Sequence, residues 1–365
     1  MEDVRAEGVG SQLRPPELLA ARARLEQGTL DPAAFKRLED RAVDDAVALQ
    51  EEVRLDVVTD GEMRRRGWMT HFHESVDGLE AGGGPGLPWR AVDPANAAET
   101  PLSRRPVVTG KLRWKRSACA EEWTYLRGRA SGLAKMSLPS AEMAAALYSP
   151  EKSSGAYPTR EEYFADVVDI LRREVAELVR LGCTYIQLDA PQYGALLDPS
   201  TREFFRLQGS DPDQMIDAGI EMDNAIIAGF PGVTFALHIC RGNNQSKFYA
   251  EGDYSPVTRL FERSNFQRYL LEYDDERSGG FTPLGHVRED AVVVLGLITT
   301  KVSAMESAEE ITSRIIEASR YVPLERLALS PQCGFASMME GNAIEGTTQR
   351  RKLELVTRVA SSVWG

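Results

Sequence analysis

Short runs of apolar and β-branched residues that end in polar residues recur along the chain, with longer amphipathic stretches between them. This alternation is typical of parallel sheets, in which each helix carries the chain across to the next strand. The strand-like runs are residues 8–11, 55–60, 133–138, 185–189, 233–238, 269–273, 292–298 and 327–330. Apolar residues at steps of three and four predict helices over residues 32–53, 160–181, 213–228 and 308–320. Eight strands with crossover helices predict an α/β fold, a single (β/α)₈ TIM barrel preceded by an N-terminal extension.

Residues 78–130 do not fit this alternation. Residues 78–100 are rich in Gly, Pro and Ala and predict an exposed loop, while residues 106–114 and 122–130 resemble the two arms of a β-hairpin. We therefore expect an insertion between the second and third strands. No linker divides the chain, so residues 1–365 are expected to form one catalytic domain.

Composition excludes several classes of partner. No apolar run approaches the roughly 20 residues that cross a bilayer, and the first 14 residues lack the apolar stretch of a secretory signal, so we expect a cytoplasmic protein. A formal charge of −12 disfavours nucleic acid, which needs clustered Lys and Arg. Four cysteines are too few for a disulfide framework in 365 residues, so we expect none.

Four potential metal ligands follow predicted strands. His238 and Cys240 are two residues apart, so both side chains can point to the same side, and Glu272 and Cys333 stand at the ends of later strands. In a barrel these strand ends share one rim. The His-x-Cys pair alone is a weak signal, because a buried cysteine beside a hydrogen-bonded histidine is more common. Together the four side chains predict a zinc site, whereas Cys119 and Cys183 are expected to be structural.

The ligand types indicate the chemistry. Two thiolates and a carboxylate donate enough charge to blunt the acidity of Zn²⁺ toward water, whereas a substrate thiol, with a pKa of about 8.5, still ionises on such a metal. Nucleotide deaminases do activate water with one His and two Cys, but their C-x-x-C pair is missing from this sequence. The set therefore favours alkylation of sulfur.

At these residues the chain resembles the cobalamin-independent methionine synthases, specifically their catalytic C-terminal barrel and shorter single-barrel relatives. The resemblance covers most of the chain and is densest at residues 238–243 (HICRGN), 271–274 (LEYD) and 330–337 (SPQCGFAS). It implies that His238, Cys240, Glu272 and Cys333 hold zinc. It also implies that the zinc binds the sulfur of homocysteine and that a methyltetrahydrofolate supplies the methyl group.

Further matches concern amino-acid recognition. Val9-Gly10-Ser11, Asp60-Gly61-Glu62 and residues 187–191 (QLDAP) resemble family motifs, which implies that Ser11 binds the substrate carboxylate and that Glu62 and Asp189 bind its amino group. Two carboxylates at strand ends also suit an ammonium on chemical grounds. The plain alternative for each is a solvated or helix-capping acid.

The departures from the family bear on the leaving group. The second acid of the family motif is Ala190 here, and Lys301 stands where the synthases carry a catalytic histidine. Lys301 is predicted to be a substitute acid or a cationic anchor, the alternative being a surface lysine; Asp189 and Lys301 are the candidate catalytic residues.

The family's N-terminal half, which helps to seat the folate tail, has no counterpart in this chain, so the methyl donor stays open. Residues 64–66 (RRR) could contact an anionic donor, although a solvated basic turn is the favoured interpretation. Trp68, Trp114 and Tyr193 could stack on a pterin, but core packing explains most aromatic residues in barrels.

The sequence thus predicts a zinc-dependent thiol S-methyltransferase, with conversion of homocysteine to methionine as the favoured reaction. One alternative is zinc-dependent alkyl transfer to another thiol, as in the coenzyme M transferases. Another is a barrel with a structural zinc and no transfer activity. The expected partners are a small-molecule thiol and a methyl donor, without nucleic acid or membrane.

Overall fold

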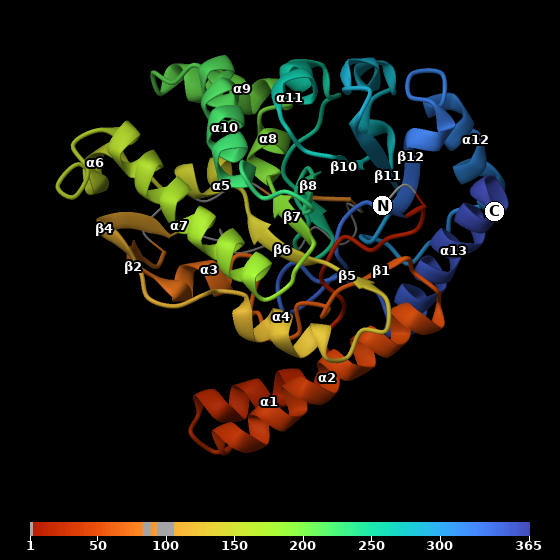
Figure 1. Cartoon of the computed structure of the whole chain (residues 1–365), viewed down its shortest axis with the longest axis horizontal. Coiled ribbons are helices and arrows are strands. Elements are labelled where there is room, and N and C mark those ends of the chain that lie inside the picture. The colour runs from red at the N-terminus through yellow and green to blue at the C-terminus, as the bar shows by residue number, and fades with distance from the viewer. Residues whose placement is uncertain (1–2, 83–88, 93–105) are drawn as a thin grey trace.

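The computed structural model describes residues 3–82, 89–92 and 106–365, and its centre is a parallel sheet flanked by helices (Figure 1). Six strands pair in the order β12-β11-β10-β8-β7-β6, all parallel. They are β6 (Met136–Pro139), β7 (Tyr185–Asp189), β8 (Thr234–Ile239), β10 (Arg268–Glu272), β11 (Val292–Ile298) and β12 (Leu327–Pro331). Each of these strands overlaps the run that was predicted for it. The predicted α/β class is confirmed.

Further parallel pairs extend this sheet at both ends. β1 (Val57–Val58) pairs with β5 (Leu133–Ala134), which leads into β6. Single parallel bridges join Ala6 to Leu329 of β12 and Glu7 to Val57 of β1. The first strand was predicted at residues 8–11 and is wrong by position: the paired residues are Ala6 and Glu7. Residues 8–11 leave the sheet instead, and the Ser11 carbonyl accepts a hydrogen bond from the Phe335 N–H at 2.8 Å.

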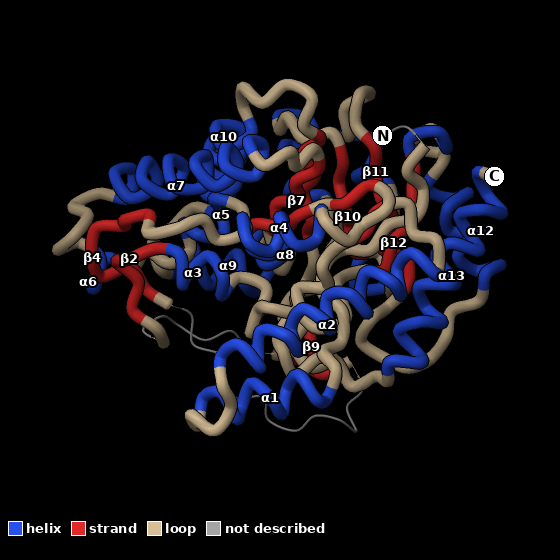
Figure 2. Tube along the Cα trace, turned by 60° about the horizontal axis from the view of Figure 1, so that its bottom comes forward, coloured by secondary structure: helices blue, strands red, loops and turns tan. Residues whose placement is uncertain are grey.

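The four predicted helices are present as α2 (Pro32–Glu52), α7 (Arg160–Arg180), α10 (Pro212–Ile227) and α12 (Ala308–Ala318). Each begins after an Asp, Thr or Ser whose side chain accepts a hydrogen bond from a backbone N–H of the first turn. α7 and α10 cover one side of the sheet, while α12 and α13 (Gly346–Trp364) lie on another (Figure 2). α1 (Pro16–Glu26), in the expected N-terminal extension, packs on α2.

The described chain also contains shorter α-helices and strands. The helices are α3 (Thr70–Ser75), α4 (Ala120–Arg127), α5 (Ala141–Ala145), α6 (Pro150–Ser153), α8 (Pro191–Ala195), α9 (Pro199–Leu207) and α11 (Thr258–Arg263). The strands are β2 (Val76–Glu80), β3 (Arg90–Ala91), β4 (Val107–Trp114) and β9 (Lys247–Phe248). Within the described residues, no helix is long and apolar enough to cross a membrane.

The predicted hairpin is half wrong. Residues 106–114 do contain strand β4, but its antiparallel partner is β2, at the start of the expected loop, and residues 120–127 form helix α4. Residues 120–127 form a helix rather than a strand because Glu122, Trp123 and Leu126 fall on one face of the helix and are buried. Residues 83–88 and 93–105 of the expected loop lie outside the described residues. The bounds of the insertion and the single domain stay predictions.

A small buried cluster fills the interior between strands. It contains Val9, Val57, Tyr185, Ala236, Leu270, Val294 and Ala328 with Val4, and a larger cluster packs the helices on the outside of the sheet. All four cysteines are buried free thiols. The two clusters fix the strands, so residues at the strand ends are held on a rigid frame.

Candidate metal and substrate site

Three of the four predicted ligands come together. The ligand atoms of His238, Cys240 and Cys333 all lie within 4.8 Å of one another, and all three residues are buried. The His238 Nδ1–H donates to the Leu270 carbonyl at 3.1 Å, whereas its buried Nε2 has no partner. A carbonyl that fixes one ring nitrogen leaves the other to bind a metal. Three donors on a tetrahedral zinc lie about 3.5–3.8 Å apart, so these residues fit a zinc ion with little movement.

The two thiols differ in charge. The Cys240 thiol donates to Cys333, and this bond, with His238 and Lys301 nearby, lowers the pKa of Cys333 well below its usual range. The same bond and burial raise the pKa of Cys240. Burial opposes ionisation of His238, but Cys333 and Asp189 raise its pKa overall. The lowered pKa favours the thiolate form of Cys333, the form in which a cysteine binds a soft divalent cation.

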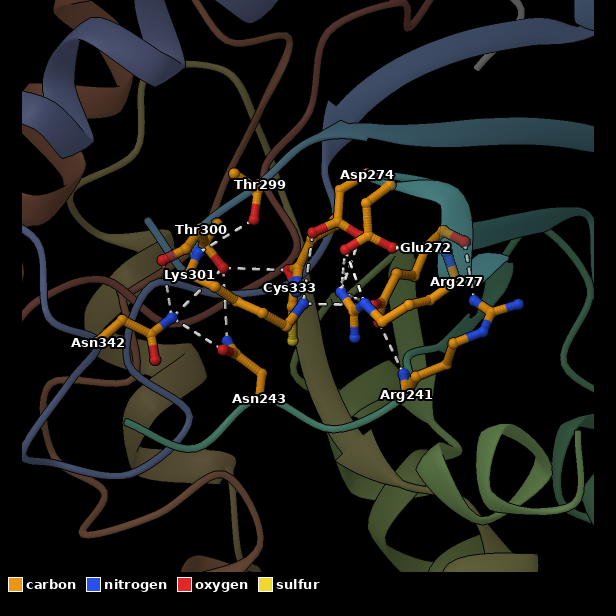
Figure 3. Close-up of polar contacts among 12 residues, drawn as sticks. Arg241, Asn243, Glu272, Asp274, Arg277, Thr299, Thr300, Lys301, Cys333 and Asn342 are labelled. Atoms are coloured by element: carbon orange, nitrogen blue, oxygen red, sulfur yellow. Dashed lines mark hydrogen bonds and ion pairs between the residues drawn. The ribbon is translucent and has the colours of Figure 1, made fainter. Parts of the chain in front are cut away.

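Glu272, the predicted fourth ligand, does not join this group. It is fully buried at the end of β10, where one oxygen accepts the Arg241 backbone N–H at 2.7 Å and the other lies 3.2 Å from Lys301 Nζ (Figure 3). Arg277 lies 3.7 Å from the same carboxylate. A metal role for Glu272 stays a prediction, and it requires the carboxylate to turn from these partners.

Lys301 is not the surface lysine of the alternative interpretation. Its side chain is buried, with Nζ 3.2 Å from Glu272 and 3.4 Å from Asp274 (Figure 3). Burial lowers the pKa of Lys301, but Asp274 and Glu272 raise it overall, so the cation is retained. Its contacts fit an anchor for buried carboxylates; the proposed acid role stays untested.

A cavity of about 550 Å³ opens at the metal group. His238, Cys240 and Cys333 line it, and so do Ser11, Glu62 and Asp189, the residues predicted to bind an amino acid. The Ser11 hydroxyl accepts the Ala336 N–H at 3.3 Å. Lys301 and Glu272 are not among the described residues that line the cavity. Segments from both ends and the middle of the sequence therefore share one cavity.

Glu62 and Asp189 are buried carboxylates that line the cavity. Glu62 follows Gly61, and both have positive φ (+54° and +66°), a sharp turn that presents the carboxylate inward. One Glu62 oxygen accepts the Ser137 hydroxyl at 3.1 Å, and the other is buried without a partner. Burial raises the pKa of Glu62 to about 7 although Arg65 lowers it, and burial also raises the pKa of Asp189. Such a pair is suited to receive an ammonium group.

A solvated basic turn was the favoured interpretation of residues 64–66, and it is wrong for two of the three arginines. Arg64 pairs with Asp40 at 2.6 Å, and Arg65 is buried against Glu122 at 2.7 Å, whereas Arg66 is exposed. Buried guanidinium groups keep their charge only with such partners. The ion pairs described for Arg64 and Arg65 are therefore with the protein's own carboxylates.

The three aromatic residues considered for stacking on a pterin lie in different surroundings. Trp68 lines the cavity, Tyr193 is buried in the core, and Trp114 is 36% exposed on β4. Two cavity residues were missed, Trp89 and Tyr249, whose ring centroids lie 5.2 Å apart at 75°. A Cβ at Gly242 would lie 2.4 Å from the Tyr249 ring and 2.9 Å from Trp89. A glycine two residues after Cys240 was the available signal for rings packed against this backbone.

Comparison with known proteins agrees with this geometry. Residues 6–354 match the family model described as cobalamin-independent synthase, catalytic domain. The Bacillus subtilis protein YxjH is 36% identical over 365 residues, which span 99% of this chain and 94% of the relative. A methionine synthase of Pyrococcus abyssi is 24% identical over 89% of this chain and 84% of its own. The structure of a putative vitamin-B12-independent methionine synthase from Listeria monocytogenes superposes with a TM-score of 0.76 at 28% identity, covering 99% of this chain and 98% of that one.

Proposed function

The chain belongs to the family of cobalamin-independent synthase catalytic domains, and from this premise we propose that it is a zinc-dependent methyltransferase that converts homocysteine to methionine. One observation carries the proposal: a His, two Cys and two buried carboxylates line the same cavity. A thiol amino acid needs a site for its sulfur and a site for its ammonium group within reach of each other. Relatives of this chain that are named methionine synthase support the same reaction.

We also propose that the parallel strands close into a (β/α)₈ barrel. The bridges of Ala6 to β12 and of Glu7 to β1, with the pair β1–β5 and the run into β6, support closure between the two ends of the six-stranded sheet. Active sites of such barrels stand at the carboxyl ends of the strands. His238, Cys240 and Cys333 occupy that end of β8 and β12.

Each residue then has a task. His238, Cys240 and Cys333 would hold the zinc, with Glu272 as the predicted fourth ligand that yields to substrate. When bound, zinc would supply a Lewis acid that lowers the pKa of the substrate thiol. Ser11 binds the substrate carboxylate, and Glu62 and Asp189 bind its ammonium group and orient the sulfur. Lys301 acts as a cationic anchor that compensates the charge of Glu272 and Asp274.

The proposal favours an amino-acid thiol over the thiol of coenzyme M. Coenzyme M has no ammonium group, so it would leave the carboxylates of Glu62 and Asp189 at the cavity without a cation of the substrate to bind. A structural zinc is also disfavoured, because such sites are closed by four protein ligands that do not exchange, whereas Lys301 and Arg241 hold the Glu272 carboxylate in a position away from the metal group to which it can return when substrate binds.

Zinc X-ray absorption of the zinc-loaded protein, with and without homocysteine, tests the function. We expect one additional sulfur scatterer on the zinc when homocysteine is added, since the substrate sulfur takes the place of an oxygen ligand. Homoserine, which has the same shape without sulfur, is the control and should leave the sulfur count unchanged. An unchanged count with homocysteine would exclude thiol activation on the metal.

Affinity for homocysteine should depend on the ionisation of Glu62. Because the pKa of this carboxyl is about 7, it is charged above pH 7 and neutral below it, so the partner of the substrate ammonium is lost as the pH falls. We expect KM to rise about tenfold between pH 8 and pH 6. Glu62→Gln should remove this dependence and show a high KM throughout.

A thiol of equal length without the amino group, 4-mercaptobutyrate, provides the control for that experiment. It should show no comparable change in KM over the same range, because it does not use Glu62. Equal pH profiles for both thiols would place the titrating group elsewhere.

A further inference from the structure

Gln187 brings to the cavity a buried oxygen atom whose role the proposed function leaves open. The side chain lies in β7, is fully buried and lines the cavity, and its Oε1 has no hydrogen-bond partner among the described residues. Oε2 of Glu62 is in the same condition. A buried acceptor without a partner costs free energy, and such atoms are rare in folded proteins. Both oxygens therefore indicate a ligand that donates hydrogen bonds.

The orientation of the Gln187 amide follows from its neighbour. Its Nε2 donates to Asp189 Oδ1 at 2.7 Å. An ionised carboxylate only accepts hydrogen bonds, so the amide nitrogen has to face Asp189 and the amide oxygen has to point away from it. This bond holds the Asp189 carboxylate in place and leaves Oε1 of Gln187 as an acceptor for another group.

Gln187 is also close to Glu62, through Ser137. In the pairing of β6 with β7, Ser137 stands opposite Gln187, and residues paired in register on neighbouring strands point to the same side of the sheet. The Ser137 hydroxyl donates to Oε1 of Glu62 at 3.1 Å. Glu62, Gln187 and Asp189 therefore bring three acceptors to one part of the cavity.

Three acceptors match the three N–H donors of an ammonium group. The two carboxylates alone would not distinguish a primary amine from an N-methylated one, because a secondary ammonium still offers one N–H to each. We propose that Gln187 is the third acceptor of the substrate ammonium, so that Glu62, Asp189 and Gln187 each accept one N–H and the site selects primary α-amino thiols; this rests on the proposed function. Gln187 thus determines specificity and takes no part in the transfer of the methyl group.

Binding of thiols to the zinc-loaded full chain, measured by calorimetry, tests this without a methyl donor. Homocysteine is compared with N-methylhomocysteine, which has one N–H fewer, and with 4-mercaptobutyrate, which has no amino group. We expect the wild type to bind N-methylhomocysteine about a hundredfold more weakly than homocysteine. The reason is that the added methyl group leaves one buried oxygen without its N–H.

Gln187→Met keeps the size of the side chain and removes both polar groups. We expect it to weaken homocysteine about tenfold and to leave 4-mercaptobutyrate and the zinc content unchanged. The penalty for the N-methyl group should fall from about a hundredfold to about tenfold, because the methyl group can then point toward an apolar side chain. A glutamine that only orients Asp189 would leave this penalty unchanged. Gln187→Leu, of similar volume, is the second variant and should give the same result.

Gln349→Met is the matched control. Gln349 is a buried glutamine on α13 that accepts the Leu13 N–H at 2.8 Å and is not among the described residues that line the cavity. This variant should bind all three thiols as the wild type does, with the full penalty for the N-methyl group.

The outcomes separate this proposal from the proposed function. Equal binding of homocysteine and N-methylhomocysteine to the wild type would overturn the selection of primary amines. A penalty that stays at about a hundredfold in the Gln187 variants would overturn the contact of Gln187 with the ammonium group. Neither result would affect thiol activation, which the sulfur count on the zinc decides. An unchanged sulfur count with homocysteine would overturn the proposed function, and this inference with it.

Discussion

Cys333→Ser is expected to abolish methyl transfer and to lower the affinity for zinc by at least about a hundredfold. Loss of a partner outside the ligand set already costs about 10- to 100-fold in metal affinity, and here a ligand itself is changed. Cys333 is the thiol whose pKa is held well below its usual range, so it brings the negative charge to the group. A serine hydroxyl stays protonated and cannot replace that thiolate. Metal content after dialysis against a zinc buffer, with turnover measured on the same sample, checks this result.

Cys183→Ser is the matched control. Cys183 is also buried, but its sulfur donates to the Tyr185 carbonyl at 3.3 Å, a bond that a hydroxyl can keep. This variant should retain its zinc and most of its activity. Full metal content in Cys333→Ser would contradict the assignment of Cys333 as a ligand, whatever the activity of the control.

The parallel sheet could be predicted because each buried strand and each crossover helix has its own local signature. The run 292–298 is apolar throughout and matches β11 to the residue. The first pairing residues could not be located, because Glu7 is a charged residue in the interior, and its burial depends on Lys135 and Arg268 more than 120 residues away. The prediction of a second hairpin strand was wrong for a similar reason. Helix α4 depends on contacts of Glu122 and Trp123 with distant segments of the chain.

The site was predictable where residue type alone restricts the chemistry. His238, Cys240 and Cys333 converge as the strand ends require, and Glu62 and Asp189 line the same cavity. Glu272 and Lys301 were harder, because their environment is set by each other and by Asp274, Arg241 and Arg277, which no local pattern connects. Trp89 lies next to residues 83–88, in a stretch whose composition predicted only a loop.

The second large effect is expected on stability, from a change at Glu7, a charged residue in the interior of the sheet. The Glu7 carboxylate accepts from Lys135 Nζ at 2.7 Å, Arg268 Nη2 at 2.7 Å and the Tyr185 hydroxyl at 2.8 Å, and all four side chains are buried. These residues come from the first, third, fourth and sixth strand regions, so one carboxylate ties together much of the sheet. Burial opposes the charge, but Lys135 and Arg268 outweigh it and lower the pKa of Glu7 to about 2.

Glu7→Gln should lower the free energy of unfolding at pH 7 by about 3–5 kcal/mol, because it leaves two buried cations without the carboxylate. The pH dependence has a definite sign. A carboxyl with a pKa of 4.5 in the unfolded chain and about 2 in the folded chain stabilises the protein above pH 4.5, and this contribution of about 3 kcal/mol is lost as the pH falls toward 2. The difference in unfolding free energy between wild type and variant, measured in urea, should therefore shrink between pH 5 and pH 3.

Glu26→Gln is the matched comparison, since Glu26 pairs with Arg66 at 2.9 Å on the surface, where both side chains are about half exposed. Glu26→Gln should lower the free energy of unfolding by less than about 1 kcal/mol. This difference from the wild type should change little between pH 5 and pH 3. If Glu7→Gln were equally mild, the buried cations would have to be hydrated or neutral in the folded protein. The buried ion pairs of Glu7 with Lys135 and Arg268 would then contribute little to the stability of the sheet.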